Sequence, residues 1–311
     1  MNSQGFTLPI PKELVNGPLN LTETMLSGQT AEPEWIKEGA EFTEVEVLGG
    51  VPVKYGLVQV GDVDDFSLEA KAITVRQITP TDEIIGNLID HVTRVLGLND
   101  DLALFYREFA EDQVISTTFR NLRGLRLMRG TELFKALICS ILSQNNSVRL
   151  WNRSARLLMK HYGRNVIFLD GSHESLFPQP ETLAKLNPRE LRLKTSIGYR
   201  AKPVVTVSRM IVSGEFDLNK LAGESYENAK DMLLELPGVG PKVADCFLLY
   251  GAGRLEAAPV DVWIHRIVSK QYFGGGKVSR MKTAAFLRER FHEWAGYAQL
   301  YLFDYARTEK A

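Results

Sequence analysis

The 311-residue sequence predicts an α+β protein in which an N-terminal antiparallel β domain precedes a mostly helical domain. Three observations lead to this fold class. Residues 1–79 contain segments with the two-residue period of β-strands, and helical periodicity dominates from residue 81 onward. A hydrophobic content of 44% with 24% charged residues is ordinary for a globular chain of this length. We therefore expect one domain over residues 1–80 and a second over 81–311.

The clearest strand signal lies at residues 42–48, where apolar and acidic side chains alternate as in a half-buried strand and two glycines follow as a turn. Two more strand-like segments follow, at 51–60 and 66–78. Thr81 or Asp82 is expected to cap the N-terminus of the first helix, because short polar side chains accept hydrogen bonds from the free N–H groups there.

The remaining sequence carries about ten or eleven helical patterns and no internal repeat. We expect helices at residues 83–96, 101–110, 131–142, 147–162, 180–186, 202–213, 226–236, 241–250, 262–271, 280–294 and 297–307.

Charge divides unevenly along the chain. Residues 1–112 carry 7 Lys and Arg against 20 Asp and Glu, a net of −13, whereas residues 113–311 carry 30 against 18, a net of +12. Chance clustering on solvated faces is one explanation. The other is that the second part of the chain binds a polyanion and the first mostly does not.

Cys139 and Cys246 are the only cysteines, and both lie in apolar helical patterns. Two cysteines exclude a disulfide framework and a four-cysteine metal or iron–sulfur site within this chain. No apolar run approaches the roughly 18 residues of a membrane helix, and the first residues do not resemble a signal peptide. We therefore expect a protein of a reducing compartment, either the cytoplasm or nucleoid of a prokaryote or the nucleus of a eukaryote, without contact to a membrane.

A tight turn at Leu236-Pro-Gly-Val-Gly240 joins two helical patterns in the region 226–250. Glycines at 238 and 240 let the backbone turn sharply and approach a ligand closely. Pro241 suits the first helical position, which places Lys242 in the first turn, where the helix dipole disfavours an ammonium. Lys242 therefore either reaches an anion or serves as a nucleophile. An ordinary helical hairpin with a glycine cap is the alternative interpretation.

Asp261 lies 19 residues beyond Lys242, before another helical pattern. It can be a plain N-cap. It can also be a carboxylate at the mouth of the same cleft, where it would stabilise the positive charge that develops on a sugar in an oxocarbenium-like transition state. The sequence around Asp261 alone leaves both interpretations open.

The unit LPGVGPKVADC at residues 236–246, followed by PVD at 259–261, closely resembles the helix-hairpin-helix (HhH-GPD) DNA glycosylase superfamily. Within it the 8-oxoguanine DNA glycosylase/AP lyases match best. A segment LSGQ at 26–29 with Trp35 looks like the N-terminal strand signature of that family. Further motifs follow in family order over roughly residues 17–307, at 124–128, 138–146, 198–201 and 294–303.

The resemblance implies a bifunctional base-excision-repair enzyme that flips a damaged nucleotide out of duplex DNA. Lys242 would attack C1′ of the deoxyribose, expel the base and form a Schiff base, after which β-elimination nicks the strand. Asp261 would stabilise the charge at C1′. No metal or redox cofactor is implied, although hairpins of this kind often hold a monovalent cation on their carbonyls. We expect a monomer whose partner is double-stranded DNA containing an oxidised purine.

Base recognition in the family maps onto four positions. The Gly28 carbonyl would accept a hydrogen bond from N7–H of 8-oxoguanine, a proton that guanine lacks. Gln299 would read the Watson–Crick edge, and Cys246 and Phe303 would sandwich the ring. Without the resemblance, Cys246 and Phe303 could equally be plain core residues.

The family also implies a set of residues that contact the DNA around the lesion. Arg149 and Arg200 would donate to the estranged cytosine, and Tyr199 would wedge into the base stack. The complete set comprises Gln144, Asn145, Asn146, Arg149, Tyr199, Arg200, Gly238, Gly240, Trp263 and His265.

Two positions depart from the eukaryotic members of the family, which have asparagine in place of Gln144 and histidine in place of Trp263. We expect these departures to affect the stringency for the opposite base and the breadth of lesions. Two alternative functions are an alkylpurine glycosylase of the same fold, which typically lacks the lysine, and a non-catalytic DNA-binding module, which would need neither Lys242 nor Asp261.

Overall fold

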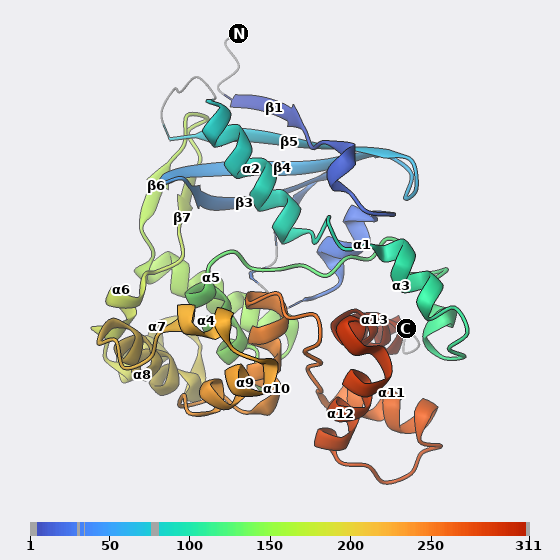
Figure 1. Ribbon diagram of the computed structural model, residues 1–311. Coiled ribbons are helices and arrows are strands. Elements are labelled where there is room, and N and C mark those ends of the chain that lie inside the picture. The colour runs from blue at the N-terminus through green and yellow to red at the C-terminus, as the bar shows by residue number, and fades with distance from the viewer. Residues whose placement is uncertain (1–4, 30–31, 34, 76–80, 309–311) are drawn as a thin grey trace.

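The computed structural model describes residues 5–29, 32–33, 35–75 and 81–308. An antiparallel five-stranded sheet is followed by a mostly helical region, which confirms the predicted α+β class (Figure 1). The strand order is β1-β5-β4-β3-β2. The strands are β1 (Gly5–Pro9), β2 (Ile36–Glu38), β3 (Glu41–Leu48), β4 (Val51–Gly61) and β5 (Phe66–Thr74).

The three predicted strands are present as β3, β4 and β5. The third is shorter than the predicted segment 66–78, because β5 ends at Thr74; residues 76–80 lie outside the described part of the chain. The strands β1 and β2 were not predicted. Both lie at the edges of the sheet, and each pairs with one neighbour only, β1 with β5 and β2 with β3.

The described residues after the sheet form twelve α-helices and a second, two-stranded sheet of β6 (Asn165–Ile167) and β7 (His173–Ser175). A further helix, α1 (Leu21–Leu26), precedes β2. The twelve are α2 (Asp82–Val95), α3 (Leu102–Glu108), α4 (Leu133–Leu142), α5 (Val148–Tyr162), α6 (Pro180–Ala184), α7 (Pro188–Thr195), α8 (Ala201–Val212), α9 (Tyr226–Leu234), α10 (Pro241–Cys246), α11 (Val262–Tyr272), α12 (Arg280–Phe291) and α13 (Ala295–Thr308). None of the helices in the described ranges is long and apolar enough to cross a bilayer.

All eleven predicted helices are present, with ends that differ by a few residues. Thr81 is the N-cap of α2, and its side chain accepts from Ile84 N–H. The predicted helix 241–250 is α-helical only to Cys246 and continues as a wider π-helical turn over Phe247–Gly251. Helices α1 and α7 and the β6–β7 hairpin were not predicted.

The acidic residues that alternate with apolar residues along β3 point toward another element and not toward solvent. Phe42, Glu44 and Glu46 share one face of the strand, and that face turns toward α4 rather than toward solvent. On the other face, Val45 and Val47 pack against Val166, Phe168 and Leu176 of the β6–β7 hairpin, which reaches the sheet from the helical region (Figure 1). Both faces of β3 are therefore covered.

Lys135 of α4 is the partner of the inward-facing carboxylates. Its ammonium lies 2.7 Å from Glu32, 3.2 Å from Glu46 and 3.8 Å from Glu44, and its side chain is 3% exposed. Burial alone would lower the pKa of Lys135, but the three carboxylates raise it well above its ordinary value. This buried cluster joins the sheet to the helix that leads to Ser143.

The carboxyl group of Glu44 is expected to make stability depend on pH. Burial raises the pKa of Glu44 from 4.5 to about 8, so the folded protein binds a proton there that the unfolded chain releases. This contribution is complete below pH 4.5 and is lost as the pH rises through about 8. Since Gln cannot ionise, Glu44→Gln should gain stability relative to the wild type between these pH values, by on the order of a few kcal/mol.

Urea unfolding of the wild type and Glu44→Gln at several pH values between 5 and 8 measures this difference. Glu38→Gln is the matched control, since Glu38 is exposed on β2. A difference between Glu44→Gln and wild type that stays constant with pH would contradict the assignment.

Helix α13 lies in the core of the helical region. Tyr297 donates a hydrogen bond to Asp100 (2.7 Å) and Tyr301 to the Leu125 carbonyl (3.0 Å), and both tyrosines are fully buried. At the other end of the chain, α2 packs on the sheet, where the His91 ring contacts the Tyr55 hydroxyl at 2.6 Å. Because α2 follows residue 80 and still packs on the sheet, the proposed domain boundary there stays a prediction.

Candidate active site

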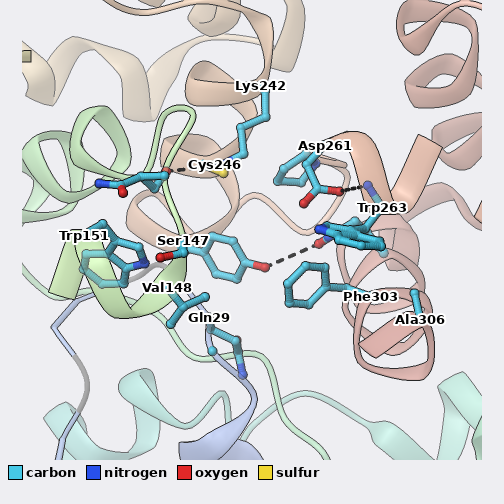
Figure 2. Close-up of a pocket in the computed structure, with 16 residues that line it drawn as sticks. Gln29, Ser147, Val148, Trp151, Lys242, Cys246, Asp261, Trp263, Phe303 and Ala306 are labelled. Atoms are coloured by element: carbon cyan, nitrogen blue, oxygen red, sulfur yellow. Dashed lines mark hydrogen bonds between the residues drawn. The ribbon is translucent and has the colours of Figure 1, made fainter. Parts of the chain in front are cut away.

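One cavity of about 440 Å³ contains all six residues predicted to be catalytic or base-binding. It lies where the loop after α1, the start of α5, α10, the start of α11 and α13 meet (Figure 2). Its wall consists of Gly28, Gln29, Ser143, Asn146, Ser147, Val148, Trp151, Lys242, Cys246, Tyr250, Pro259, Asp261, Trp263, Gln299, Phe303 and Ala306. Residues separated by almost the whole chain thus share one site.

Lys242 enters this cavity from the hairpin between α9 and α10. Gly238 has φ +83°, and a Cβ there would lie 2.6 Å from Pro203 Cβ, so the turn requires glycine for both reasons. Gly240 is the N-cap with an ordinary φ of −103°, and a Cβ on it would meet open space. Only the first glycine is therefore needed for the turn itself, while the second leaves its surface open to a close approach.

The Lys242 amine has a defined partner. Its Nζ donates to Ser143 Oγ at 3.1 Å, and the Ser143 hydroxyl in turn donates to the Ser140 carbonyl at 2.8 Å. The lysine is half-buried, whereas Ser143 is buried. The end of α4 therefore positions the amine at the cavity wall (Figure 2).

The back of α10 is fixed by a buried network. Asp245 accepts from the Tyr226 hydroxyl at 2.6 Å and from Lys230 at 2.9 Å, both on α9. Arg288 of α12 donates to the same tyrosine at 3.2 Å. These charge-assisted bonds tie three helices together and hold the helix that carries Lys242.

Asp261 is the N-cap of α11, as one of its two interpretations predicted. Its Oδ1 accepts from the N–H groups of Trp263 and Ile264, each at 2.9 Å. Figure 2 shows the other carboxylate oxygen turned toward the cavity. The cap thus fixes the orientation of the carboxylate and leaves one oxygen at the site, so that both interpretations can hold together.

The loop at Gly28 is not a strand, so that part of the prediction is wrong. Helix α1 ends at Leu26, and Gly28 has φ +77°. The buried Gln29 fixes the loop: its amide donates to Ser27 Oγ and the Arg126 carbonyl, and its Oε1 accepts from Met128 N–H at 2.6 Å. A side chain that satisfies three backbone or hydroxyl groups holds the Gly28 backbone at the cavity wall.

Arg126, in the motif at 124–128, continues this scaffold. The side chain is fully buried, and among the described residues its hydrogen bonds go to backbone carbonyls. Burial lowers the pKa of Arg126 below its ordinary value. Its acceptors are the carbonyls of Asn16, Pro18, Gly97, Leu98 and Asp100. The motif therefore has a structural role behind the loop that carries Gly28.

Gln299 on α13 is positioned by a residue that the sequence analysis did not single out. The Tyr250 hydroxyl donates to Gln299 Oε1 at 3.3 Å, and burial raises the pKa of Tyr250 well above its ordinary value, so the phenol stays protonated. The side-chain oxygen of Gln299 therefore already accepts a hydrogen bond. Cys246 is buried at the same wall and Phe303 is half-buried.

The predicted wedge residues gather at one loop between α4 and α5. Asn145 has φ +45°, and Tyr199, which is 55% exposed, donates to Gln144 Oε1 at 3.2 Å. Asn146 lines the cavity and donates to the Leu142 carbonyl. The loop and Tyr199 therefore form one exposed projection beside the cavity mouth.

The two arginines predicted to contact the estranged cytosine, Arg149 and Arg200, differ in their exposure and in their contacts. Arg200 is 7% exposed, stacks on Tyr199 with its guanidinium carbon 4.5 Å from the ring centre, and donates to the carbonyls of Gln144 and Asn145. Arg149 is exposed in the first turn of α5. Arg200 thus holds the wedge loop in this structure, and its contact with an estranged base stays a prediction, as does that of Arg149.

Of the two ring-bearing residues that follow Asp261, Trp263 and His265, one lies at the cavity and the other does not. Trp263 lines the cavity, 38% exposed, with the Arg266 guanidinium carbon 5.4 Å from its ring centre. His265 does not line the cavity; its Nδ1 lies 3.0 Å from Thr283 Oγ1 on α12. The structure therefore brings Trp263, but not His265, to the cavity.

Eight of the sixteen cavity residues were not among the predicted site residues, and Ser143, Trp151 and Tyr250 are three of them. A signal existed for each of these three. Ser143 immediately precedes the predicted wedge, and Trp151 lies one helical turn after Val148 on the same face of α5. Tyr250 follows Cys246 by four residues, the spacing that places two side chains on one face of the predicted helix 241–250.

Among the described residues no group of three or more His, Cys, Asp and Glu side chains could hold a metal ion. A monovalent cation at the hairpin stays a prediction. Two carbonyls of the turn already accept hydrogen bonds, Leu236 from Val239 N–H at 3.0 Å and Gly238 from the Gln144 amide at 3.5 Å.

Comparison with known proteins identifies relatives over nearly the whole chain. Residues 138–293 match the HhH-GPD superfamily of base excision DNA repair proteins. A protein of Methanothermobacter thermautotrophicus named "Probable N-glycosylase/DNA lyase" is 34% identical, with 94% of each chain covered. The solved structure of MBOgg1 with a low-affinity DNA ligand superposes with a TM-score of 0.82 at 27% identity, covering 100% of this chain and 98% of the other.

The same fold occurs in the 8-oxoguanine glycosylase/lyase of Clostridium acetobutylicum, solved with DNA that contains cytosine opposite 8-oxoguanine. Its TM-score is 0.79 at 22% identity, with 98% of this chain and 99% of that chain covered.

Proposed function

The chain belongs to the HhH-GPD superfamily of base excision DNA repair proteins and is a DNA glycosylase with AP lyase activity, and from this premise we propose that it excises 8-oxoguanine paired with cytosine. The observation that carries the proposal is the convergence of Gly28, Lys242, Cys246, Asp261, Gln299 and Phe303 on one cavity. A lysine amine, a carboxylate and a base-sized pocket are the components that a glycosylase and lyase step require.

The proposed chemistry starts with the neutral Lys242 amine, held by Ser143 at the cavity wall. The amine attacks C1′ of the flipped nucleotide, the bond from C1′ to the base breaks, and the base leaves with a proton. The amine-bound sugar opens to a Schiff base, which acidifies C2′. Loss of a C2′ proton then expels the 3′ phosphate by β-elimination.

Asp261 stabilises the transition state of the first of these steps, in which the bond from C1′ to the base breaks. Positive charge develops at C1′ as the bond to the base lengthens, and a fixed carboxylate in a partly enclosed site lowers the energy of that state. Because Trp263 and Ile264 N–H groups hold Oδ1, the carboxylate needs no reorientation when the charge appears. This preorganisation is what makes the cap useful to catalysis.

Recognition of the base is proposed to depend on N7. 8-Oxoguanine carries N7–H, which donates to the Gly28 carbonyl, whereas guanine presents a lone pair that the carbonyl repels. Gln29 keeps this carbonyl in place through its three hydrogen bonds. Tyr250 occupies the carbonyl end of Gln299, which leaves the amide N–H groups for the base.

The preference for cytosine is proposed to rest mainly on Arg149. Arg149 is exposed beside the wedge loop, whereas Arg200 already donates to the loop carbonyls. Tyr199 is 55% exposed, which supports the proposal that it enters the stack when the nucleotide leaves it. We therefore assign Arg200 to support of the wedge and Arg149 to the opposite base.

Borohydride trapping tests this substrate assignment. The wild type should form a covalent adduct with a duplex that contains 8-oxoguanine opposite cytosine, because borohydride reduces the Schiff base. Replacing cytosine by each other base should lower the excision rate, by roughly tenfold or more when a bidentate arginine contact is lost. Base release from an alkylated purine without any adduct would instead indicate the alkylpurine class and refute the substrate assignment.

A further inference from the structure

Two hydrogen bonds at Ser143 have directions that only one placement of the protons allows. The Ser143 hydroxyl lies 2.8 Å from the Ser140 carbonyl oxygen. A carbonyl oxygen can only accept, so the single hydroxyl proton of Ser143 points at Ser140. Ser143 Oγ therefore turns its lone pairs, and no proton, toward Lys242 Nζ at 3.1 Å.

The direction of this bond decides what the amine of Lys242 can do. A lysine attacks with the lone pair of its neutral amine. A hydroxyl that donated to the amine would occupy that lone pair. An oxygen that accepts takes one N–H instead, which selects one of the staggered orientations about the terminal C–N bond and leaves the lone pair free.

No carboxylate competes with Ser143 for this amine. Among the described residues Lys242 Nζ has no carboxylate within ion-pair distance, and Oδ1 of Asp261 accepts from the Trp263 and Ile264 N–H groups. An ion pair with a carboxylate stabilises an ammonium, which has no lone pair to attack with. Ser143 holds the amine through an acceptor that carries no charge.

Both sides of the contact are fixed by buried groups. Ser143 is 6% exposed at the end of α4, and its N–H donates to the Cys139 carbonyl at 3.0 Å. The carbonyl of the next residue, Gln144, accepts from Arg200. Lys242 belongs to α10, which a buried carboxylate ties to α9. The hydroxyl oxygen and the amine therefore meet in one defined geometry.

We propose that Ser143 is a positioning residue, whose acceptor oxygen orients the Lys242 amine so that its lone pair faces C1′ of the flipped nucleotide. The inference rests on the proposed function, in which Lys242 is the nucleophile. Ser143 then acts in both reactions of the site, because the amine attacks C1′ of a damaged nucleotide in base excision and C1′ of an abasic site in strand cleavage. A residue that reads the base affects base excision alone.

Ser143→Thr and Ser143→Val test the oxygen, because the two side chains have nearly the same shape and only threonine has a hydroxyl. Ser143→Val should slow two processes by the same factor, single-turnover excision of 8-oxoguanine and borohydride trapping on a preformed abasic site. The factor should be about fivefold to tenfold, as the loss of one hydrogen bond to the nucleophile predicts. Ser143→Thr should stay within about twofold of wild type in both.

DNA affinity separates this role from an effect on the wedge loop, since Ser143 directly precedes Gln144. Fluorescence anisotropy with a duplex that contains a tetrahydrofuran abasic analogue measures binding without reaction, because the analogue has no C1′ leaving group or aldehyde for the amine. Wild type and both variants should bind this duplex with Kd values within about twofold of one another.

If Ser143→Val does not fold, Ser143→Ala replaces it, with Ser208→Ala as the matched control. Ser208 is a fully buried serine whose hydroxyl also donates to a helix carbonyl, that of Val204 at 2.7 Å. It lies on α8 and does not line the cavity. Ser208→Ala should leave both rates within about twofold of wild type, whereas Ser143→Ala should lower both by the same factor.

Equal rates for Ser143→Thr and Ser143→Val would show that the oxygen has no role. Weaker DNA binding with an unchanged rate at saturating enzyme would assign Ser143 to the wedge loop, and slower excision with normal trapping on abasic DNA would assign it to base recognition. Each of these results overturns the proposal. A wild type that forms no adduct would refute the lysine chemistry itself, which is distinct from equal rates of two variants that both form the adduct.

Discussion

Lys242→Gln is expected to abolish the borohydride adduct and strand cleavage and to slow base excision by about a thousandfold or more. Glutamine replaces the nucleophilic amine, whose Nζ lies 3.1 Å from Ser143 Oγ, by an uncharged amide on a slightly shorter side chain that is still polar. The local structure should therefore persist while the chemistry is lost. Gel trapping with 8-oxoguanine DNA and thermal unfolding of the variant measure the two effects separately.

Lys12→Gln provides the control for this change, because Lys12 is an exposed residue paired with Asp65 away from the cavity. An adduct that persists in Lys242→Gln would assign the Schiff base to another amine. Loss of the adduct with full base excision would show that water, rather than the lysine, displaces the base.

Asp261→Asn is expected to slow excision by about a hundredfold to a thousandfold while DNA affinity and folding change little. Asparagine is as good an N-cap as aspartate, so the bonds from Trp263 and Ile264 N–H can persist and the free energy of unfolding should change by about half a kcal/mol or less. Only the negative charge at the cavity is removed. Single-turnover rates and fluorescence anisotropy with lesion DNA report the two quantities.

Asp101→Asn is the matched control, since Asp101 caps α3 through Leu104 N–H and does not line the cavity. It should change stability as Asp261→Asn does and leave excision unchanged. If Asp261→Asn lowered the DNA affinity and the excision rate by the same factor, Asp261 would act only as the N-cap of α11.

Local chemistry made much of the fold predictable. The helix caps at Thr81 and Asp261 accept the hydrogen bonds that short polar side chains provide, and the period of β3 and β4 marked both strands. The hairpin glycine at 238 is required by its positive φ and by Pro203. Each of these features depends on residues close together in the sequence, which is why the sequence revealed them.

The faces of β3 were not predictable in this way. Glu44 and Glu46 turn inward because Lys135, about ninety residues later in the chain, lies against them, and Val45 and Val47 are covered by a hairpin at 165–175. A pattern of alternating residues determines which side chains share a face but not which face another element will cover.

The candidate site shows the same division. Gly28, Lys242, Asp261 and Gln299 were identified through motifs, and the structure brings them together. Tyr250 lies outside those motifs and is recognised only from its partner, because its phenol donates to Gln299 Oε1. The role of a polar side chain depends on the groups that it contacts, and the sequence alone does not show which groups those are.

The position of α13 has a consequence for synthesis of the protein. During translation Gly28, Lys242 and Asp261 leave the ribosome before Gln299 and Phe303, which α13 supplies. Until Tyr297 and Tyr301 anchor this helix to Asp100 and Leu125, a nascent chain has the Lys242 amine and the hairpin but lacks the wall that we propose to distinguish one base from another. On the proposed roles of Gln299 and Phe303, base selectivity is therefore the last property that the growing chain acquires, together with the final part of its core.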